Sequence, residues 1–484
     1  MGTSDPSAGM LDRVQEYKGA RVTVMGLGLH GGGVASARFF ATAGALVTVT
    51  DLRDKTTLEP AIRQLEGLPI RFVLGEHREE DFALADIVIK NPAVRADSPF
   101  LRLAVRVETD ISMFLRYSRS PLIAVTGSKG KSSVASAIWY ALRASGRTAL
   151  LGGNITVSPL DFLDATAPDV PVVLELSSWQ LGDLRGRSTL KPIVAVLTAV
   201  YPDHLNYYGT MDAYVADKRL IYANQDERCW TVCCADQDWG RAFASETKGN
   251  VLWYSEHELK SRLGPAARGG WFEKEDGSND IAGYGQFDSG EHKELLVPAS
   301  VAVQGLHQKK NLLAAAVALR AFGLSSEAIS GSLASFPGVP HRLERVGQFH
   351  GVAWFNDSAA TIPDAAIAAI RSFSAPTVLI AGGSDKLSDY AEFAAVSRGL
   401  KALILLAGSG TERMLPLLEA RGVPHRGPFS SMREAVESAD SVAAPGDVVL
   451  LSPGCASFGM FLHEFERGDV FRAEVRRLAE RERA

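Results

Sequence analysis

Residues 122–133 read Leu122-Ile-Ala-Val-Thr-Gly-Ser-Lys-Gly-Lys-Ser-Ser133, and they place a glycine loop between a strand and a helix. The apolar residues at 122–125 predict a buried strand, and residues 133–145 predict a helix. Backbone N–H groups of such a loop can surround phosphate oxygens, and the helix adds the positive end of its dipole. Lys131 is placed to reach the β- and γ-phosphates of a nucleotide, and the Ser132 hydroxyl can hold Mg²⁺. The loop therefore predicts phosphate binding, against the plainer interpretation of a glycine-rich turn with a surface lysine.

Two further polar positions follow strands that are expected in the same sheet. Glu175 lies near the end of the apolar run 171–176, and Asp203-His204 follows the run 193–198. Ligands of open α/β sheets bind at the carboxyl ends of the strands. Mg²⁺ prefers hard oxygen ligands, so Glu175 is a natural partner for Ser132, although a strand-end glutamate can also simply be solvated. A lone histidine is usually a surface residue, but the position of His204 at this edge favours a metal ligand.

Upstream of the loop, the sequence predicts a βαβ unit. A strand at 21–25 runs into Gly26-Leu-Gly-Leu-His-Gly31, a small-residue helix covers 34–44, and a second strand at 45–50 leads to Asp51. Alone, this Gly-x-Gly-x-x-Gly turn suggests a dinucleotide. Further strands are expected at 70–74 and 86–89, with a linker at 116–121.

Downstream, the same strand–turn–helix pattern continues. A strand is expected at 229–234, short strands and loops at 240–300, and a helix at 311–321. A third unit starts near Leu343, and its expected elements are strands at 352–355, 377–381, 402–407 and 447–452 and a charged terminal helix at 467–484. The repetition predicts an α/β protein with parallel sheets covered by helices on both faces. We expect three domains, at residues 1–120, 121–342 and 343–484.

Composition narrows the class of protein. The 484 residues include 51 Lys and Arg against 56 Asp and Glu, which gives a net charge of −5 and argues against a nucleic-acid-coating protein. No apolar run approaches the roughly 18 residues that span a bilayer, and the first residues lack an apolar signal core, so we expect a cytoplasmic enzyme. The four cysteines are too few for a disulfide scaffold, and Cys229, Cys233 and Cys234 on one strand are best interpreted as core thiols.

Seven motifs occur along the chain in this order: Thr126-Gly-Ser-Lys-Gly-Lys-Ser-Ser, Gly152-Gly-Asn154-Ile, Glu175-Leu-Ser-Ser-Trp-Gln180, Asp203-His204-Leu, Tyr214-Val-Ala-Asp-Lys218, Phe336-Pro-Gly-Val-Pro-His341-Arg342-Leu-Glu344 and Asn356-Asp357-Ser358. Together they resemble the Mur ligases, the ATP-dependent amide-forming enzymes of peptidoglycan precursor synthesis. The N-terminal glycine turn, the Glu175 motif and Leu450-Leu-Ser-Pro-Gly-Cys-Ala-Ser457-Phe are most similar to the branch that joins D-glutamate to UDP-N-acetylmuramoyl-L-alanine. The resemblance covers about residues 20–475.

The resemblance implies a set of functional residues in the central part of the chain. The residues implied to bind ATP are Gly127, Ser128, Lys129, Gly130, Lys131, Ser132, Ser133, Asn311, Arg342 and Asp357. The residues implied to act in catalysis are Lys131, Glu175, His204 and Lys218, with Ser132, Glu175, His204 and carbamylated Lys218 holding two Mg²⁺ ions. Carbamylation turns the ammonium of Lys218 into a carboxylate-like anion, which suits Mg²⁺, whereas without the resemblance Lys218 is one more helix-surface lysine.

The resemblance also assigns the two substrates. The N-terminal turn would bind the UDP of the substrate, because any diphosphate needs the same backbone donors. The residues implied at the UDP end are Leu29, His30, Leu52, Arg53 and Asn91, and those at the muramoyl-alanine end are Asn154, Ser177 and Gln180. Thr361, Lys386 and Ser457 would bind glutamate, with Ser457 after a glycine turn where a helix N-terminus would favour an anion. We expect a monomer that binds these small molecules and neither nucleic acid nor membrane.

The chain departs from the family pattern in the expected glutamate pocket. Ala359 stands where the family commonly has a lysine, which removes a cation from this pocket. Other departures from the family pattern are Lys129, Gln308, Ile362 and Pro363, whereas Val125 departs from the general phosphate-loop pattern, which has a glycine at that position. The reaction class is therefore better supported than the choice of D-glutamate over L-glutamate, which a sister group uses. Three other hypotheses are a dinucleotide-dependent oxidoreductase, a non-catalytic nucleotide sensor, and a folylpolyglutamate synthase, which lacks the N-terminal UDP-type domain.

Overall fold

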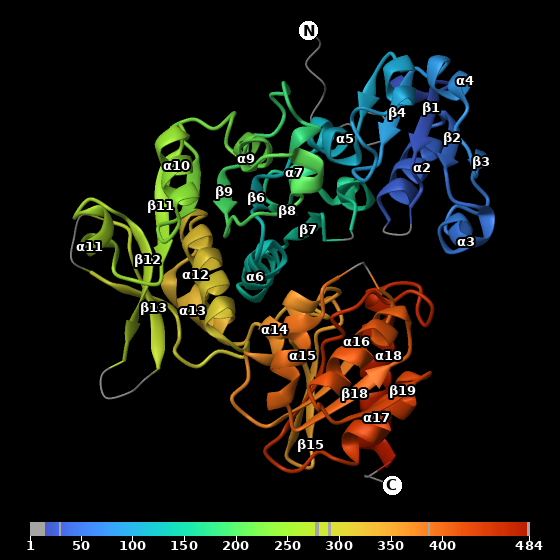
Figure 1. The fold of residues 1–484 in the computed structure, drawn as a ribbon. Helices are drawn as coiled ribbons and strands as arrows, with labels where there is room; N and C mark the ends of the chain where they lie inside the picture. The colour runs from blue at the N-terminus through green and yellow to red at the C-terminus, as the bar shows by residue number, and fades with distance from the viewer. Residues whose placement is uncertain are drawn as a thin grey trace. The chain divides into compact units, whose positions relative to one another are not determined.

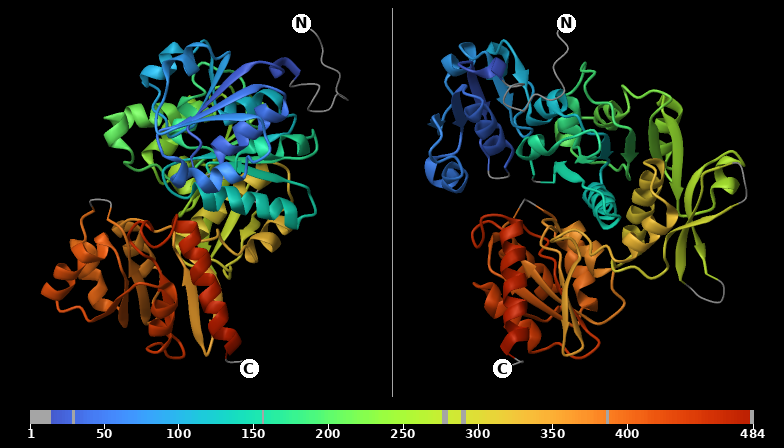
Figure 2. Two further views of the ribbon diagram at one scale, coloured as in Figure 1. Left: turned by 90° about the vertical axis from the view of Figure 1, so that its right-hand side faces the viewer. Right: turned by 180° about the vertical axis from the view of Figure 1, so that it is seen from behind.

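The structure is a computed structural model that describes residues 15–28, 31–155, 157–275, 280–288, 292–385 and 388–481 (Figures 1 and 2). Three predicted site residues, Leu29, His30 and Lys386, lie outside these ranges. The chain forms two compact units, residues 1–300 with 310–334, and residues 301–309 with 335–484. The expected division into three domains stays a prediction. No helix within the described ranges is both long and apolar enough to cross a membrane.

The first sheet of the first unit is fully parallel, in the order β3-β2-β1-β4-β5. Its elements are strands β1 Arg21–Met25, β2 Leu46–Asp51, β3 Ile70–Leu74, β4 Ile87–Lys90 and β5 Val107–Glu108, and helices α2 Gly32–Thr42, α3 Lys55–Arg63, α4 Glu79–Ala83 and α5 Asp110–Tyr117. Apart from the exposed Arg21 of β1 and the buried Lys90 of β4, the residues of these two strands are β-branched or apolar and buried, as expected for strands covered on both faces. The expected linker at 116–121 was partly wrong, because α5 continues to Tyr117. A capping box of Thr109 and Ser112 starts this helix.

The second sheet has nine strands in the order β14-β13-β12-β11-β10-β9-β6-β8-β7. The strands are β6 Leu122–Thr126, β7 Leu150–Gly153, β8 Val172–Glu175, β9 Val194–Leu197, β10 Trp230–Cys234, β11 Asn250–Ser255, β12 Gly269–Lys274, β13 Ile281–Gln286 and β14 Glu294–Val297. The helices are α6 Lys131–Ala144, α7 Ser178–Gly182, α8 Leu205–Tyr208, α9 Met211–Lys218, α10 Asp238–Glu246, α11 Leu259–Leu263, α12 Leu306–Ala321 and α13 Ser326–Ala334. The strands from β7 to β12 pair in parallel, whereas β13 and β14 are antiparallel additions.

The segment 240–300 contains more helix than the sequence suggested. Helix α10 begins at Asp238 and buries Phe243, and the short α11 buries Leu259. Helix α12 begins five residues before the expected start at 311. Its first turn, Leu306 to Lys309, is largely polar, so the apolar periodicity marked only the buried part of the helix.

The second unit contains a six-stranded sheet in the order β15-β16-β20-β17-β18-β19. Its strands are β15 Glu344–Phe349, β16 Val352–Asn356, β17 Thr377–Gly382, β18 Ala402–Leu406, β19 His425–Phe429 and β20 Val448–Leu451. Its helices are α14 Pro363–Ile370, α15 Ala391–Val396, α16 Ser409–Ala420, α17 Met432–Asp440 and α18 Glu464–Arg481. Helices α14, α15 and α16 cover one face, and α17 and α18 cover the other (Figure 1).

The sequence missed β15 and β19, the two edge strands of this sheet. Neither is fully buried at any position, and β19 contains Gly427 and Pro428. Edge strands tolerate proline and polar residues because one side of their backbone is not paired, so they lack the apolar run that revealed the central strands.

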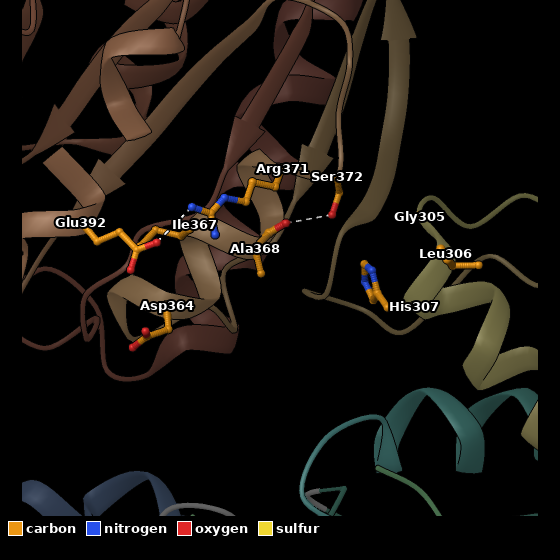
Figure 3. Close-up of a pocket in the computed structure, with 9 residues that line it drawn as sticks. All are labelled: Gly305, Leu306, His307, Asp364, Ile367, Ala368, Arg371, Ser372 and Glu392. Atoms are coloured by element: carbon orange, nitrogen blue, oxygen red, sulfur yellow. Dashed lines mark hydrogen bonds and ion pairs between the residues drawn. The ribbon is translucent and has the colours of Figure 1, made fainter. Parts of the chain in front are cut away.

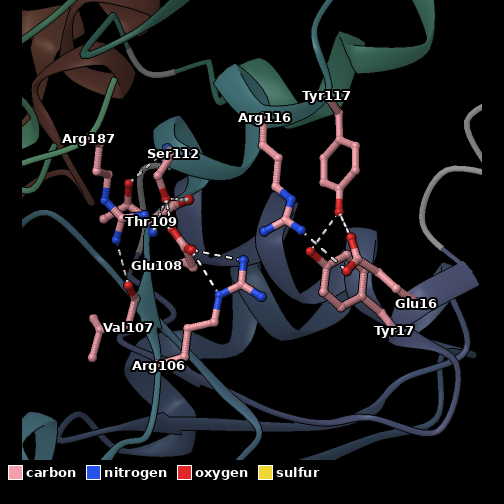
Figure 4. A network of polar contacts seen from close by, with 10 residues as sticks. All are labelled: Glu16, Tyr17, Arg106, Val107, Glu108, Thr109, Ser112, Arg116, Tyr117 and Arg187. Atoms are coloured by element: carbon pink, nitrogen blue, oxygen red, sulfur yellow. Dashed lines mark hydrogen bonds and ion pairs between the residues drawn. The ribbon is translucent and has the colours of Figure 1, made fainter. Parts of the chain in front are cut away.

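The first two sheets share one continuous hydrophobic core, which runs from Tyr17 to Phe243. A polar network reinforces the junction (Figure 4). Glu108 at the end of β5 accepts hydrogen bonds from Arg106, from the Ser112 hydroxyl and from Arg187, which follows α7. Because charged residues of both sheets meet at one buried carboxylate, the network fixes the N-terminal sheet on the central one.

Candidate functional site

The glycine loop predicted from the sequence lies between β6 and α6. Gly127 and Gly130 have φ angles of 145° and 91°, which disfavour any side chain. A Cβ atom at Gly127 would lie 1.9 Å from the Thr198 hydroxyl, and one at Gly130 would lie 2.3 Å from Oδ1 of Asn311. The loop therefore requires both glycines, and Asn311 of α12 packs directly against it, as the ATP assignment needs.

The loop amides divide into two groups. The amides of Ser128 and Lys129 both donate to the carbonyl of Ala199, at 2.8 and 3.2 Å, so they brace the loop against the chain after β9. The first intrahelical bond of α6 is Val134 N to Gly130 O, at 2.9 Å. Amides that precede this bond have no acceptor inside the helix, so the start of α6 is the part of the loop suited to phosphate oxygens.

Lys131 lies over the loop. Its Nζ donates to the carbonyls of Gly127 and Ser128, each at 3.0 Å. Ser132 is partly buried beside it, Ser133 is buried, and Lys129 is exposed. The ammonium group therefore lies where a phosphate bound to the loop amides would meet it.

Glu175 ends β8, which pairs with β6 so that Val125 and Glu175 are in register. The residue is 1% exposed. Its Oε1 accepts from Nδ2 of Asn154 at 2.9 Å, while its Oε2 has no hydrogen-bond partner among the described residues. A buried carboxylate oxygen without a donor is costly, and a bound cation would satisfy it. Glu175 and the Ser132 hydroxyl are the hard oxygen ligands that Mg²⁺ prefers, so these residues fit that ion.

Lys218 is the most unusual cation of the site. The last residue of α9, it is 1% exposed, and its Nζ donates to Gly127 O at 2.8 Å and lies 4.3 Å from the centre of the Tyr214 ring. Burial, followed by the nearby charge of Lys131, lowers the pKa of Lys218 from 10.5 to about 6. The amine is therefore neutral at pH 7, which is the nucleophilic form. The burial of Lys218 could not be predicted from the sequence, because the apolar and polar residues of α9 do not separate into two clear faces.

His204 lies at the start of α8 and is adjacent to an aromatic group. Its ring centre is 4.9 Å from that of Trp179 and 6.2 Å from that of Tyr214. Burial lowers the pKa of His204, the charge of Asp203 opposes this shift, and the charge of Lys131 adds to it. A neutral imidazole can serve as a metal ligand. No cluster of three or more His, Cys, Asp or Glu with metal-ligand geometry occurs within the described ranges, so any metal here needs other ligands as well.

The residues predicted at the muramoyl-alanine end form hydrogen bonds within the protein. Ser177 and Gln180 form a capping box for α7, in which each side chain accepts from the backbone amide of the other, at 3.2 and 3.0 Å. Asn154 holds Glu175 as described above. Sequence reasoning missed Trp179, whose buried indole N–H has no hydrogen-bond acceptor among the described residues. An aromatic residue inside a motif gives no signal that separates this position from core packing.

The N-terminal glycine turn is held by Asp51. One carboxylate oxygen accepts from Gly28 N at 3.1 Å and the other from Arg53 N at 2.9 Å. A Cβ at Gly33 would lie 2.3 Å from the Leu27 carbonyl, so α2 packs closely on the turn. Asp51 therefore holds the backbone of the glycine turn in place from the end of β2.

Asn91 and its neighbour Lys90 close the other side of this turn. Asn91 Nδ2 donates to Gly26 O at 3.4 Å, while Leu52 and Arg53 are exposed beyond β2. Lys90 is buried and pairs with Asp183 at 2.8 Å, a contact between the first two sheets that the sequence gave no means of predicting.

In the second unit, Asp357 follows β16. Its Oδ2 accepts from the Ser452 hydroxyl at 2.7 Å and its Oδ1 from Leu343 N at 3.1 Å. Burial raises the pKa of Asp357 to about 7, against the lowering effect of these hydrogen bonds. Arg342 is exposed at the start of the unit.

The remaining predicted glutamate residues lie on loops of the same sheet. Thr361 and Ala359 are partly buried, and Ser457 is 3% exposed. The expectation that Ser457 starts a helix was wrong, because α18 begins at Glu464, after a turn that contains Gly459. The acidic first turn of α18 suits the positive end of its own dipole and would repel an anion.

A separate cavity of about 560 Å³ lies in the second unit, between the segment 305–307 and helix α14 (Figure 3). Its charged groups include Arg371 and Glu392, which pair with each other at 3.0 Å, and Asp364. The lining offers no predicted site residue. All four cysteines are buried and carry thiols without a disulfide, and burial raises the pKa of Cys233 well above that of an ordinary thiol, which supports the prediction of core thiols.

Comparison with known proteins gives consistent matches along the chain. Family models described as Mur ligase MurD-like N-terminal domain, Mur ligase middle domain, and Mur ligase glutamate ligase domain match residues 20–112, 125–319 and 341–455. The UDP-N-acetylmuramoylalanine–D-glutamate ligase of Treponema pallidum (strain Nichols) is 40% identical, over 95% of this chain and 98% of the relative. The enzyme of the same name from Roseiflexus sp. (strain RS-1) is 42% identical, over 95% and 99%.

Solved structures agree on the fold. The crystal structure of UDP-N-acetylmuramate-alanine ligase MurC from Thermotoga maritima has a TM-score of 0.61 at 19% identity, covering 96% of this chain and 99% of that one. MurF ligase from Thermotoga maritima in complex with ADP has a TM-score of 0.53 at 18% identity, covering 90% and 96%. At these identities the likeness shows the α/β fold that the sequence predicted.

Proposed function

The chain belongs to the Mur ligase family, and we propose that it is an ATP-dependent ligase that joins D-glutamate to UDP-N-acetylmuramoyl-L-alanine in peptidoglycan precursor synthesis. The observation that carries this proposal is the identity of about 40% along nearly the whole length of two D-glutamate ligases. We place the reaction in the cytoplasm and expect a monomer, with the three domains bounded near residues 120 and 342.

The proposed reaction proceeds through an acyl phosphate. The carboxylate of the substrate attacks the γ-phosphorus of ATP, the bond to the bridging oxygen breaks, and ADP leaves. The amine of glutamate then attacks the acyl carbon and displaces inorganic phosphate. Lys131 and the amides at the start of α6 are placed to stabilise charge on the transferring phosphoryl group. Asn311, which packs on Gly130, is assigned to the nucleotide, together with Arg342 and Asp357.

The metal ligands follow from the buried oxygens of the site. We assign Ser132 and Glu175 to one Mg²⁺ ion, because the orphaned Oε2 of Glu175 needs a cation. His204, which burial keeps neutral, is assigned to a second ion. Mg²⁺, when bound, would supply positive charge to the phosphate oxygens.

Lys218 is assigned as a carbamate. A neutral amine adds to CO₂ to give an N-carboxylate and a proton, and its lowered pKa keeps Lys218 neutral at pH 7. The carbamate would convert this buried neutral amine into an anionic oxygen ligand for a metal ion. Mass spectrometry of the intact protein under CO₂ would detect this adduct.

For the substrates, we assign the glycine turn, Leu29, His30, Leu52, Arg53 and Asn91 to the UDP end. Asn154, Ser177 and Gln180 are assigned to the muramoyl-alanine end, and Thr361, Lys386 and Ser457 to glutamate. The alternative function is the addition of L-glutamate, the activity of a sister group. Ala359 favours this alternative, because the lysine that is common in the family is missing at this position.

The experiment is product analysis by mass spectrometry after incubation with Mg-ATP, UDP-N-acetylmuramoyl-L-alanine and D-glutamate. The proposal expects a product heavier by one glutamyl residue and one phosphate released per product. Phosphate release without this product would contradict ligation, and reduction of a nicotinamide cofactor in its place would support the oxidoreductase.

A further inference from the structure

Arg467 is a buried cation in the second unit, on the first turns of α18. The residue is 1% exposed. Its Nε donates to the Ser358 hydroxyl at 3.0 Å, its Nη2 to the Ser358 carbonyl at 2.9 Å, and its Nη1 to the Cys455 carbonyl at 3.1 Å. All three acceptors are uncharged, so the guanidinium is held by hydrogen bonds and by no carboxylate.

The charge of Arg467 lacks a partner among the residues that the structure describes. Other arginines of the same helix behave differently, since Arg472 pairs with Glu344 at 2.8 Å and Arg477 pairs with Glu437 at 2.7 Å. Burial lowers the pKa of Arg467 to about 10, a value at which the group stays protonated at pH 7. Cys455 and, to a smaller extent, Glu464 oppose this shift, and neither forms an ion pair with Arg467 among the described residues. A buried, unpaired charge is costly, so its retention calls for a compensating anion.

The position of Arg467 links three loops at the carboxyl ends of β16, β17 and β20. It binds Ser358 on the first and Cys455 on the third, and a Cβ built on Gly383 of the second would lie 3.4 Å from its Nη1. Backbone bonds join the same loops, with Ser384 N donating to Ala456 O at 2.9 Å and Gly454 N donating to Ala360 O at 2.9 Å.

These three loops carry the residues assigned to glutamate. Thr361 lies three residues after Ser358, Ser457 lies two residues after Cys455, and Lys386 lies three residues after Gly383. One guanidinium therefore hydrogen-bonds two of the three loops to which the glutamate residues are assigned, and it lies close to the backbone of the third.

We propose that Arg467 is the positioning residue of the glutamate site, and that its uncompensated charge supplies the positive potential that Ala359 does not. The two carboxylates of bound glutamate are the anions that would balance the charge of Arg467. The guanidinium would attract them without direct contact, because water screens charges only weakly inside a buried site. This inference rests on the proposed function, because it takes glutamate as the ligand of the three loops.

The test compares Arg467→Met, Arg467→Lys and the control Arg472→Met, which removes an ion-paired arginine from the same helix. The KM values for D-glutamate, ATP and the UDP-substrate are measured together with kcat and the melting temperature. We expect Arg467→Met to raise the KM for D-glutamate about 10- to 100-fold while the other two KM values change less than about twofold. Arg467→Lys, which keeps the charge and loses the fork, should recover part of this loss. Arg472→Met should leave all three KM values near those of the wild type.

Two results would overturn the inference. Equal rises of all three KM values, or a lowered melting temperature with an unchanged KM for D-glutamate, would assign Arg467 to general stability. If Arg467→Met does not fold, Arg467→Lys provides the test. A KM for D-glutamate in Arg467→Lys that equals those of the wild type and of Arg472→Met would exclude a positioning role for the forked guanidinium group. A wild-type enzyme that forms no product with D-glutamate would overturn the proposed function itself, and this inference with it.

Discussion

Replacing Asp357 by Asn should stabilise the second unit at alkaline pH and much less at acidic pH. The Asp357 carboxyl is buried after β16, and burial raises its pKa from 3.8 to about 7. Asparagine has the same shape, so its Oδ1 can keep the bond from Leu343 N, and its amide can donate to the Ser452 hydroxyl that now donates to Oδ2. The substitution therefore removes an ionisable group and keeps the local packing.

The sign follows from proton binding. Between pH 3.8 and about 7 the folded protein holds a proton on Asp357 that the unfolded chain has released, so the free energy of unfolding falls as pH rises and levels off above pH 7. At about 1.4 kcal/mol per pH unit, the wild type pays about 2 kcal/mol at pH 5 and about 4 kcal/mol at pH 8. The advantage of the variant should therefore grow by about 3 kcal/mol between these pH values. For a domain of this size, that corresponds to a rise of about 6–12 °C in Tm relative to the wild type.

Calorimetric melts at pH 5 and pH 8 measure this difference. The matched control is Asp364→Asn, which makes the same change on an exposed carboxylate of α14 (Figure 3). The control should shift stability by less than about 1 kcal/mol, and equally at both pH values. A stability gain for Asp357→Asn that is the same at pH 5 and pH 8 would show that Asp357 does not titrate between these pH values, which contradicts a raised pKa for this carboxyl.

Three further predictions concern the phosphate site. Lys131→Ala should lower kcat about 10³-fold, because its Nζ lies over the loop carbonyls where it can meet a phosphate. Binding of the UDP-substrate, measured by calorimetry, should stay intact. Wild-type turnover would exclude this loop as the phosphate-binding site. Gly130→Ala should abolish ATP binding and destabilise the protein by about 1–2 kcal/mol. The φ angle of Gly130 is 91°, and the new Cβ would collide with Asn311. A titration that gives wild-type affinity for ATP would contradict this prediction. Bicarbonate, as a source of CO₂ for the Lys218 carbamate, should raise the Tm of the wild type and leave the Tm of Lys218→Met unchanged. The Lys218→Met variant should also be inactive. An equal rise of Tm in both proteins would argue against a carbamate.

The sequence predicted the elements whose residues are buried on both faces. Strand β1 begins and ends where expected, and the central strands of all three sheets were found, because continuous apolar runs mark them. The edge strand β3 was also predicted with the right bounds, although Val73 is its only buried residue. The edge strands β15 and β19 and the helix α10 were not predicted. Their residues are partly exposed, so burial leaves a weak pattern in the sequence, and their pairing depends on contacts far along the chain.

The candidate site divides in the same way. Lys131 and Glu175 were predictable because a loop and a strand end carry a local signal. The neutral state of Lys218, the indole of Trp179 and the burial of Arg467 depend on which segments surround them. Arg467 shows this most clearly, since the sequence placed it on a charged terminal helix, whereas the structure buries it against Ser358, 109 residues away. Long-range packing of this kind has no periodic signature.

The decisive measurement for the proposed ligase is phosphate release from Mg-ATP and UDP-N-acetylmuramoyl-L-alanine with D-glutamate, with L-glutamate and with no amino acid. We predict release with D-glutamate, and none above background in the other two reactions. Release with L-glutamate in place of D-glutamate would contradict the stereochemistry and assign the chain to the sister activity that Ala359 suggests. Release with neither would contradict the proposed ligase.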